Sequence, residues 1–191
     1  MIKKIGILLI IGGLVLISMI YLPIVKEEFS YQASIAQSRI SEEKIIPKSR
    51  DFGLVIPRIQ INEQIFSGID PTNPSEYLPV LTQGVAQARG SAFPGKEGNV
   101  FIFAHSSDTP LNITRYNAVF YLIGKLNPSD EIIIYYQKRQ YTYQVTDKKI
   151  LSPKELEEFL GTLEGKTLTL QTCYPPGTTL KRLIVIAKEA D

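Results

Sequence analysis

The sequence predicts a closed all-β barrel with one or two short helices, preceded by a helix that crosses a membrane. Two observations predict the barrel: short runs of β-branched and aromatic residues are divided by turn residues, and many such runs occur within roughly 140 residues. A third observation, an uninterrupted apolar stretch near the N-terminus, predicts the membrane helix. The length of 191 residues suits one folded domain with an appendage.

Residues 5–25 are predicted to form a transmembrane signal-anchor. No charged side chain lies between Lys4 and Lys26, and a helix needs about 20 apolar residues to cross a bilayer. Lysines precede the run, whereas two glutamates follow Lys26, so the positive-inside rule places residues 1–4 in the cytoplasm and the rest outside, at the cell membrane. A cleaved signal peptide is the alternative, although the apolar run exceeds the ~7–15 residues typical of one.

Residues 26–51 are polar and mixed in charge, and we interpret them as an extracellular stalk. From residue 52 the pattern changes to short alternating runs, so the folded domain is expected over residues 52–191. Closure of the strands would remove the exposed edges of an open sheet. The candidate strands are residues 53–56, 61–66, 99–104, 131–137, 140–146, 168–172 and 182–188.

A hairpin and a helix are the clearest local elements. The fourth and fifth candidate strands are joined near Lys138 and Arg139, without the Asn-Gly pair favoured in tight hairpins, so the turn type stays open. Ser152 can cap a helix over residues 153–160, which has proline at its first position.

Composition excludes several functions. The chain has 21 basic and 19 acidic residues and a net charge of +2, so bulk electrostatics do not indicate a nucleic-acid partner. One cysteine and one histidine exclude an internal disulfide and cannot build a tetrahedral zinc site unaided. In general a lone cysteine is a small buried apolar residue, and a lone histidine is a hydrogen-bonded structural one. The positions of these two residues favour a different interpretation.

Three segments place reactive side chains at strand ends. His105 follows an apolar strand and precedes polar residues, which puts an imidazole at the mouth of a sheet. Cys173 ends an alternating strand, and Pro-Pro-Gly soon forces a turn. Arg182 opens the next strand, whose antiparallel return could bring the guanidinium within reach of the sulfur.

These three groups suit nucleophilic catalysis. A thiol becomes a strong nucleophile as its thiolate, which nearby cations favour. Attack on an amide carbonyl forms an oxyanion that Arg182 could stabilise, and one such donor contributes about 3 kcal/mol. The imidazole of His105 could then protonate the departing amine.

The same segments resemble the sortase family over about residues 52–187. The sequence Thr169-Leu170-Gln171-Thr172-Cys173 matches the family signature T-L-x-T-C, and Arg182 follows the cysteine by nine positions, as the catalytic arginine of the family does. The strand ending in Ala104-His105 resembles the one that carries the catalytic histidine. Residues 54–59 and 91–95 add upstream matches.

This resemblance implies an eight-stranded sortase barrel and a cysteine transpeptidase. Cys173 would attack the Thr–Gly bond of an LPXTG-like sorting signal on a surface protein or pilin, forming a thioacyl enzyme. An amine of a peptidoglycan precursor or a pilin lysine would then resolve it. His105 and Arg182 would be the other catalytic residues. Thr172 and Ala104 would line the substrate groove, although a structural role within its strand fits Thr172 equally well.

The chain also departs from the family pattern. Gln87 stands where sortases often have a second histidine, Ala104 where they commonly have glycine, and Ser106 where they often have arginine. Some sortases bind calcium through acidic residues near the groove. We expect no cofactor or metal here, because the glutamates of residues 153–160 are better interpreted as a solvated helix face.

Other classes fit the sequence less well. Papain-like peptidases place the cysteine before the histidine and at the start of a helix, and L,D-transpeptidases carry a Ser-x-Gly-Cys motif that is absent here. The non-enzymatic alternative is a membrane-anchored β-barrel that binds surface proteins, with an inert Cys173 and His105. Labelling with a thiol reagent would separate the two, because a catalytic cysteine must be accessible.

Overall fold

The computed structural model describes residues 45–106 and 118–190. The chain divides into two units, Met1–Ile40 and Ser41–Asp191. The expected signal-anchor and most of the expected stalk lie outside the described residues. Within the described ranges, no helix is both long enough and apolar enough to span a bilayer.

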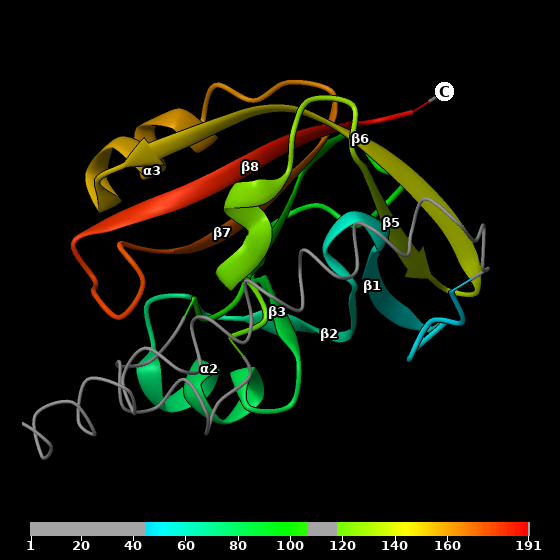
Figure 1. The fold of residues 1–191 in the computed structure, drawn as a ribbon, viewed down its shortest axis with the longest axis horizontal. Coiled ribbons are helices and arrows are strands. Elements are labelled where there is room, and N and C mark those ends of the chain that lie inside the picture. Colours follow the sequence, from blue (N-terminus) through cyan, green and yellow to red (C-terminus); the bar gives the residue numbers. More distant parts are fainter. Residues whose placement is uncertain (1–44, 107–117, 191) are drawn as a thin grey trace, which may run out of the picture. The chain divides into compact units, whose positions relative to one another are not determined.

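Eight strands form a closed barrel in the order β1-β2-β3-β4-β7-β8-β6-β5 (Figure 1). The prediction of a closed eight-stranded barrel is therefore confirmed for the folded domain, and two short α-helices accompany it. The strands are β1 (Phe52–Ile56), β2 (Ile61–Ile69), β3 (Val85–Ala88), β4 (Gly98–Phe103), β5 (Glu131–Tyr136), β6 (Arg139–Leu151), β7 (Lys166–Tyr174) and β8 (Lys181–Glu189). The helices are α2 (Pro74–Leu81) and α3 (Pro153–Leu160), with 3-10 turns η1 (Pro57–Ile59) and η2 (Tyr121–Lys125).

Two pairs of strands in the barrel are parallel, β2 with β3 and β4 with β7. A parallel pair needs a crossover connection. The chain from β2 to β3 passes through α2, and the chain from β4 to β7 passes through β5, β6 and α3. Because β4 and β7 run in the same direction, their carboxyl ends lie at the same end of the barrel.

The interior of the barrel is filled by branched aliphatic side chains from alternate strand positions. Leu54, Ile102, Ile134, Leu170 and Ile184 are completely buried. Burying each such side chain contributes about 1.5–3 kcal/mol relative to leaving it exposed. The strands that end at the candidate site are thus held by a packed core.

All seven expected strands are present, with shifted ends. The largest difference is β6, which was expected to end at residue 146 but continues to Leu151. A bulge between Val145 and Asp147 adjusts its register, and the strand stays paired with β8 over its second half. One strand and one helix, β3 and α2, had not been predicted.

The structure shows the turn of the predicted hairpin and the cap of the predicted helix. Gln137 and Lys138 form the two-residue turn between β5 and β6, with φ of 49° and 66°, as in a type I′ turn. The predicted helix cap is confirmed. The Ser152 side chain accepts a hydrogen bond from the Glu155 amide, and a Glu155 carboxylate oxygen accepts one from the Ser152 amide at 2.7 Å.

Candidate active site

The carboxyl ends of β4 and β7 bring the predicted imidazole and thiol to the same end of the barrel. Phe103, the last residue of β4, is the register partner of Gln171 in this parallel pair. Two positions further along the chain lie His105, just after β4, and Cys173, still within β7. On the other side of β7, Cys173 is the antiparallel partner of Arg182 in β8. Three neighbouring strands therefore supply His105, Cys173 and Arg182.

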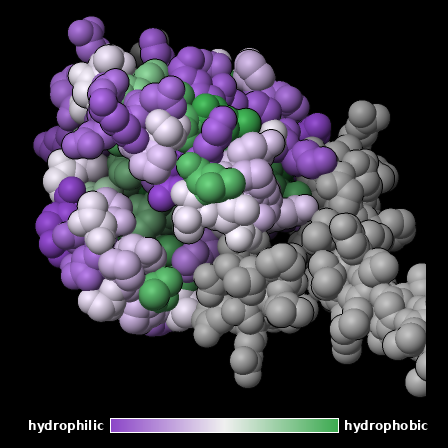
Figure 2. Space-filling view, turned by 90° about the vertical axis from the view of Figure 1, so that its left-hand side faces the viewer, coloured by the Kyte–Doolittle hydropathy of each residue, from purple (hydrophilic) through white to green (hydrophobic). Residues whose placement is uncertain are grey.

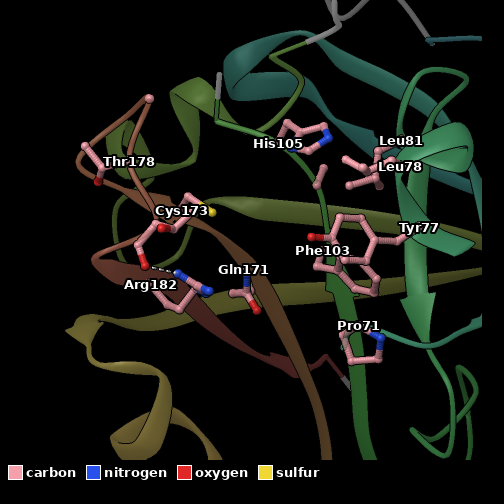
Figure 3. A pocket seen from close by; sticks show the side chains of 13 residues that line it. Pro71, Tyr77, Leu78, Leu81, Phe103, His105, Gln171, Cys173, Thr178 and Arg182 are labelled. Atoms are coloured by element: carbon pink, nitrogen blue, oxygen red, sulfur yellow. Dashed lines mark hydrogen bonds between the residues drawn. The ribbon is translucent and has the colours of Figure 1, made fainter. Parts of the chain in front are cut away.

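All three residues line one pocket of about 180 Å³ (Figure 3). The α2 helix forms the opposite wall with apolar and aromatic side chains, and Thr178 and Thr179 border the pocket from the β7–β8 connection. Figure 2 shows apolar surface gathered in a hollow on this side of the domain, bordered by hydrophilic residues. The lining residues are Pro71, Tyr77, Leu78, Leu81, Phe103, Ala104, His105, Gln171, Cys173, Gly177, Thr178, Thr179 and Arg182.

The guanidinium of Arg182 is oriented by the main chain. Its Nη1 donates hydrogen bonds to the carbonyl oxygens of Thr179 and Lys181, each at 3.0 Å. A guanidinium has five N–H donors in a rigid plane, so these bonds orient it while other donors stay available to a ligand. The arrangement provides a fixed positive charge at the pocket.

The structure separates the two expected substrate-groove residues. Ala104 lines the pocket, but Thr172 does not: it is 2% exposed, and its hydroxyl donates a hydrogen bond to the Ala104 carbonyl at 2.9 Å. Successive side chains of a strand point to opposite faces, so Thr172 faces away from the pocket that Gln171 and Cys173 line. Its hydroxyl links β7 to the residue before His105.

Several pocket residues were missed by the sequence interpretation. Gln171 lies two positions before Cys173 and on the same face of β7, so strand alternation could have identified it. Tyr77, Leu78 and Leu81 belong to α2, which had not been predicted, and no sequence signal connected them to the site.

The amide of Gln87 holds the start of the β3–β4 connection. The side chain is buried, and its Oε1 accepts a hydrogen bond from the Gly68 amide at 3.3 Å. Its Nε2 donates to the Ser91 hydroxyl and the Ala92 carbonyl, both at 3.1 Å. These bonds give Gln87 a structural role beside the strand that precedes His105.

Charged side chains attach α2 to the barrel. Arg89, just after β3, forms ion pairs with Glu76 of α2 and with Asp70 of the preceding loop, the latter at 3.6 Å. Hydrogen bonds from the side chain and backbone of Thr72, with a smaller contribution from Arg89, lower the pKa of Asp70 below its ordinary value. This network, Asp70–Glu76–Arg89, holds the helix that forms the apolar wall.

Acidic residues near the site take part in local structure. Hydrogen bonds with the backbone and side chain of Ser152 lower the pKa of Glu155, which completes the α3 capping box. Glu158 lies 4.0 Å from Lys154 on the same helix. Among the described residues, no three His, Cys, Asp or Glu side chains are grouped so as to hold a metal ion.

The fold is a closed β-barrel that brings a cysteine, a histidine and an arginine into one pocket, and comparison with known proteins identifies the family. The sortase domain family matches residues 54–190, and the chain belongs to the sortase family.

Two curated relatives are Sortase D of Bacillus subtilis and Sortase A of Streptococcus agalactiae. The first is 25% identical over 138 residues, which cover 71% of this chain and 61% of the relative. The second is 28% identical over 173 residues, which cover 85% of this chain and 64% of the relative. The chain thus spans less than two thirds of the length of these relatives.

Solved sortase structures share the fold. Sortase A from Corynebacterium diphtheriae aligns with a TM-score of 0.61 and 25% identity, covering 74% of this chain and 60% of that one. Sortase C-1 from Actinomyces oris aligns with a TM-score of 0.60 and 25% identity, covering 88% and 85%.

Proposed function

We propose that this protein is a sortase transpeptidase that cleaves an LPXTG-like sorting signal and transfers the acyl part to an amine. The observation that carries the proposal is the convergence of Cys173, His105 and Arg182 on one pocket from three neighbouring strands, in a chain of the sortase family. In this proposal Cys173 is the nucleophile, His105 the general acid and base, and Arg182 the oxyanion donor.

The first half-reaction forms a thioester. The Cys173 thiolate attacks the threonine carbonyl carbon of the signal, and Arg182 stabilises the oxyanion that develops. When the C–N bond breaks, protonated His105 gives its proton to the departing glycine amine. The acyl part of the signal is then bound to Cys173 through sulfur.

The second half-reaction reverses these roles. An acceptor amine attacks the thioester, neutral His105 takes the proton that the amine loses, and an amide forms as the Cys173 thiolate departs. The apolar side chains of Leu78, Leu81 and Phe103 on the pocket wall support transfer over hydrolysis, because they limit the water that can approach the thioester.

Membership of the sortase family, together with this chemistry, supports the following partners. The donors are surface proteins or pilins with an LPXTG-like C-terminal signal, and the acceptor is an amine of a peptidoglycan precursor or a pilin lysine. A membrane anchor over residues 5–25 would hold the domain outside the cell, where such partners are found. The steps use side chains of this chain alone and include no cofactor.

The test uses the full-length chain in detergent with an LPXTG-like peptide and hydroxylamine, analysed by mass spectrometry. We expect an acyl adduct on Cys173 and a hydroxamate product, both lost in Cys173→Ala and His105→Ala. No adduct across a panel of varied signals, together with a Cys173 that resists thiol reagents, would contradict the proposal. That result would favour a barrel that binds surface proteins without catalysis.

A further inference from the structure

Two polar side chains stand out in the apolar part of the pocket. The carboxamide of Gln171 comes from β7, and the hydroxyl of Tyr77 comes from α2 and points into the pocket (Figure 3). Both residues are half-buried. Neither the carboxamide nor the hydroxyl has a hydrogen-bond partner within the part of the chain that the structure describes.

The ring of Tyr77 is held in place by Phe103. The two ring centroids are 6.1 Å apart, and the rings meet edge to face with an interplanar angle of 86°. This geometry is a favoured one for aromatic pairs. The Tyr77 hydroxyl is therefore directed by packing, while Gln171 is fixed on β7 as the register partner of Phe103.

The position of this pair relative to the reacting bond follows from the strands. Gln171 lies two residues before Cys173 on the same strand face, which is about 6.6 Å along the strand. His105 must lie beside the departing amine in the proposed reaction. The acyl part of the signal therefore extends from Cys173 away from His105, over Gln171 and Phe103.

That distance corresponds to about two residues of extended peptide. The side chain just before the acylated threonine, the variable residue of an LPXTG-like signal, would thus lie within reach of the Gln171 carboxamide and the Tyr77 hydroxyl. Both groups can donate and accept hydrogen bonds. An apolar side chain placed against them would expel water and leave both groups without hydrogen-bond partners, which weakens binding. An amide or hydroxyl side chain would form hydrogen bonds with them instead.

We propose that Gln171 and Tyr77 form a polar subsite that selects an uncharged polar side chain in the sorting signal, at the variable position just before the acylated threonine. Leu78, Leu81 and Pro71 line the same pocket and disfavour a basic side chain there, because it would meet the positive charge of Arg182 in an apolar surrounding. The inference rests on the proposed function and assigns its substrate preference to two residues outside the catalytic trio.

The experiment compares competing sorting-signal peptides on the full-length chain in detergent. The peptides carry leucine, asparagine, glutamine, serine or glutamate at the variable position just before the threonine, and mass spectrometry measures the ratio of Cys173 adducts. We expect the protein to favour an amide or hydroxyl peptide over the leucine peptide by about fivefold, the effect of one hydrogen bond. Gln171→Leu and Tyr77→Phe should each lower that ratio severalfold.

A double-mutant cycle and a matched control sharpen the test. Because both side chains contact the same substrate group, the double variant should lower the ratio by less than the product of the single effects. Gln144→Leu removes an amide from an exposed position of β6 that does not line the pocket, and it should leave the ratio unchanged.

Each outcome decides one of the two proposals. A preference for leucine at that position, or an equal loss of acylation for all peptides in the variants, would overturn the polar subsite and leave the transpeptidase intact. If no peptide acylates Cys173, the proposed function fails, and binding of the same peptides to Cys173→Ala by fluorescence polarisation decides the subsite. Binding that discriminates by polarity would support it, and binding without discrimination, or none, would overturn it.

Discussion

Cys173 and Arg182 lie directly opposite each other in the antiparallel pair of β7 and β8. Opposed residues in such a pair have Cβ atoms about 4.5–5.5 Å apart. The two side chains are therefore brought together by strand register, and two backbone carbonyls, those of Thr179 and Lys181, then orient the guanidinium. The positive charge beside the thiol is thus placed by main-chain geometry.

Replacing Arg182 should affect the rate more than substrate binding. We expect Arg182→Ala and Arg182→Lys to lower kcat by about 10²-fold, because lysine cannot hold two carbonyls and present a planar donor to the oxyanion. KM should change little. Peptide-cleavage kinetics measure both constants, with Lys181→Ala as an exposed control on the same strand. A wild-type kcat for Arg182→Lys would contradict the oxyanion role.

Thr172 should matter for stability. Thr172→Val keeps the shape of the side chain but leaves the buried Ala104 carbonyl without its hydroxyl donor, which should lower the free energy of unfolding by about 1–2 kcal/mol. Thr172→Ser keeps the hydroxyl and should therefore lower the free energy of unfolding by less than Thr172→Val does. Urea denaturation of the two variants measures the difference. Equal stability of the valine and serine variants would show that the hydrogen bond contributes nothing.

Two glycines with similar backbones separate strain from steric overlap. Gly95 and Gly90 have φ of 78° and 82°, but a Cβ on Gly95 would lie 2.5 Å from the ring of Tyr141, whereas nothing lies within 4 Å of one on Gly90. Gly90→Ala should lower the free energy of unfolding by about 1 kcal/mol, because alanine is strained in the left-handed backbone conformation. Gly95→Ala should lower the free energy of unfolding by more, and thermal unfolding should show the larger drop in melting temperature for this variant. Equal melting temperatures would contradict the predicted overlap.

The network Asp70–Glu76–Arg89 should make stability depend on pH. The pKa of Asp70 is lowered in the folded state, so its contribution is fully present above the ordinary value of 3.8 and is lost as pH falls through the lower folded value. Asp70→Asn should melt at a lower temperature than the wild type at pH 7, and the gap should close below about pH 4. A gap that persists at pH 2 would indicate a packing effect instead.

The sequence predicted the part of the site that depends on single strands. Apolar or alternating runs that end at His105 and Cys173 and begin at Arg182 revealed both the strands and the reactive side chains, and these strands are present. Thr172 was assigned to the groove although it stands next to Cys173, and strand alternation alone places neighbouring residues on opposite faces. That difference arises from parity within one strand and was visible in the sequence.

The α2 wall could not be predicted because its stability depends on tertiary contacts. The helix contains Pro74 and Pro79 and has little amphipathic character. Ion pairs from Arg89 to Asp70 and Glu76 attach it to the barrel, and these partners are far apart in sequence. Strand β3 was missed for a similar reason, because it has only four residues, two of them alanine. The sequence therefore did not predict the wall of the pocket that contains Tyr77.

The position of β8 determines when the site can exist. This strand is the last of the barrel in sequence, yet it lies between β6 and β7 and supplies Arg182. A chain that has reached only Leu180 contains the thiol and the imidazole, but its barrel is open and the guanidinium is missing. The site can therefore be assembled only after the barrel closes, so a partly synthesised chain carries the cysteine and the histidine without the guanidinium that completes the pocket.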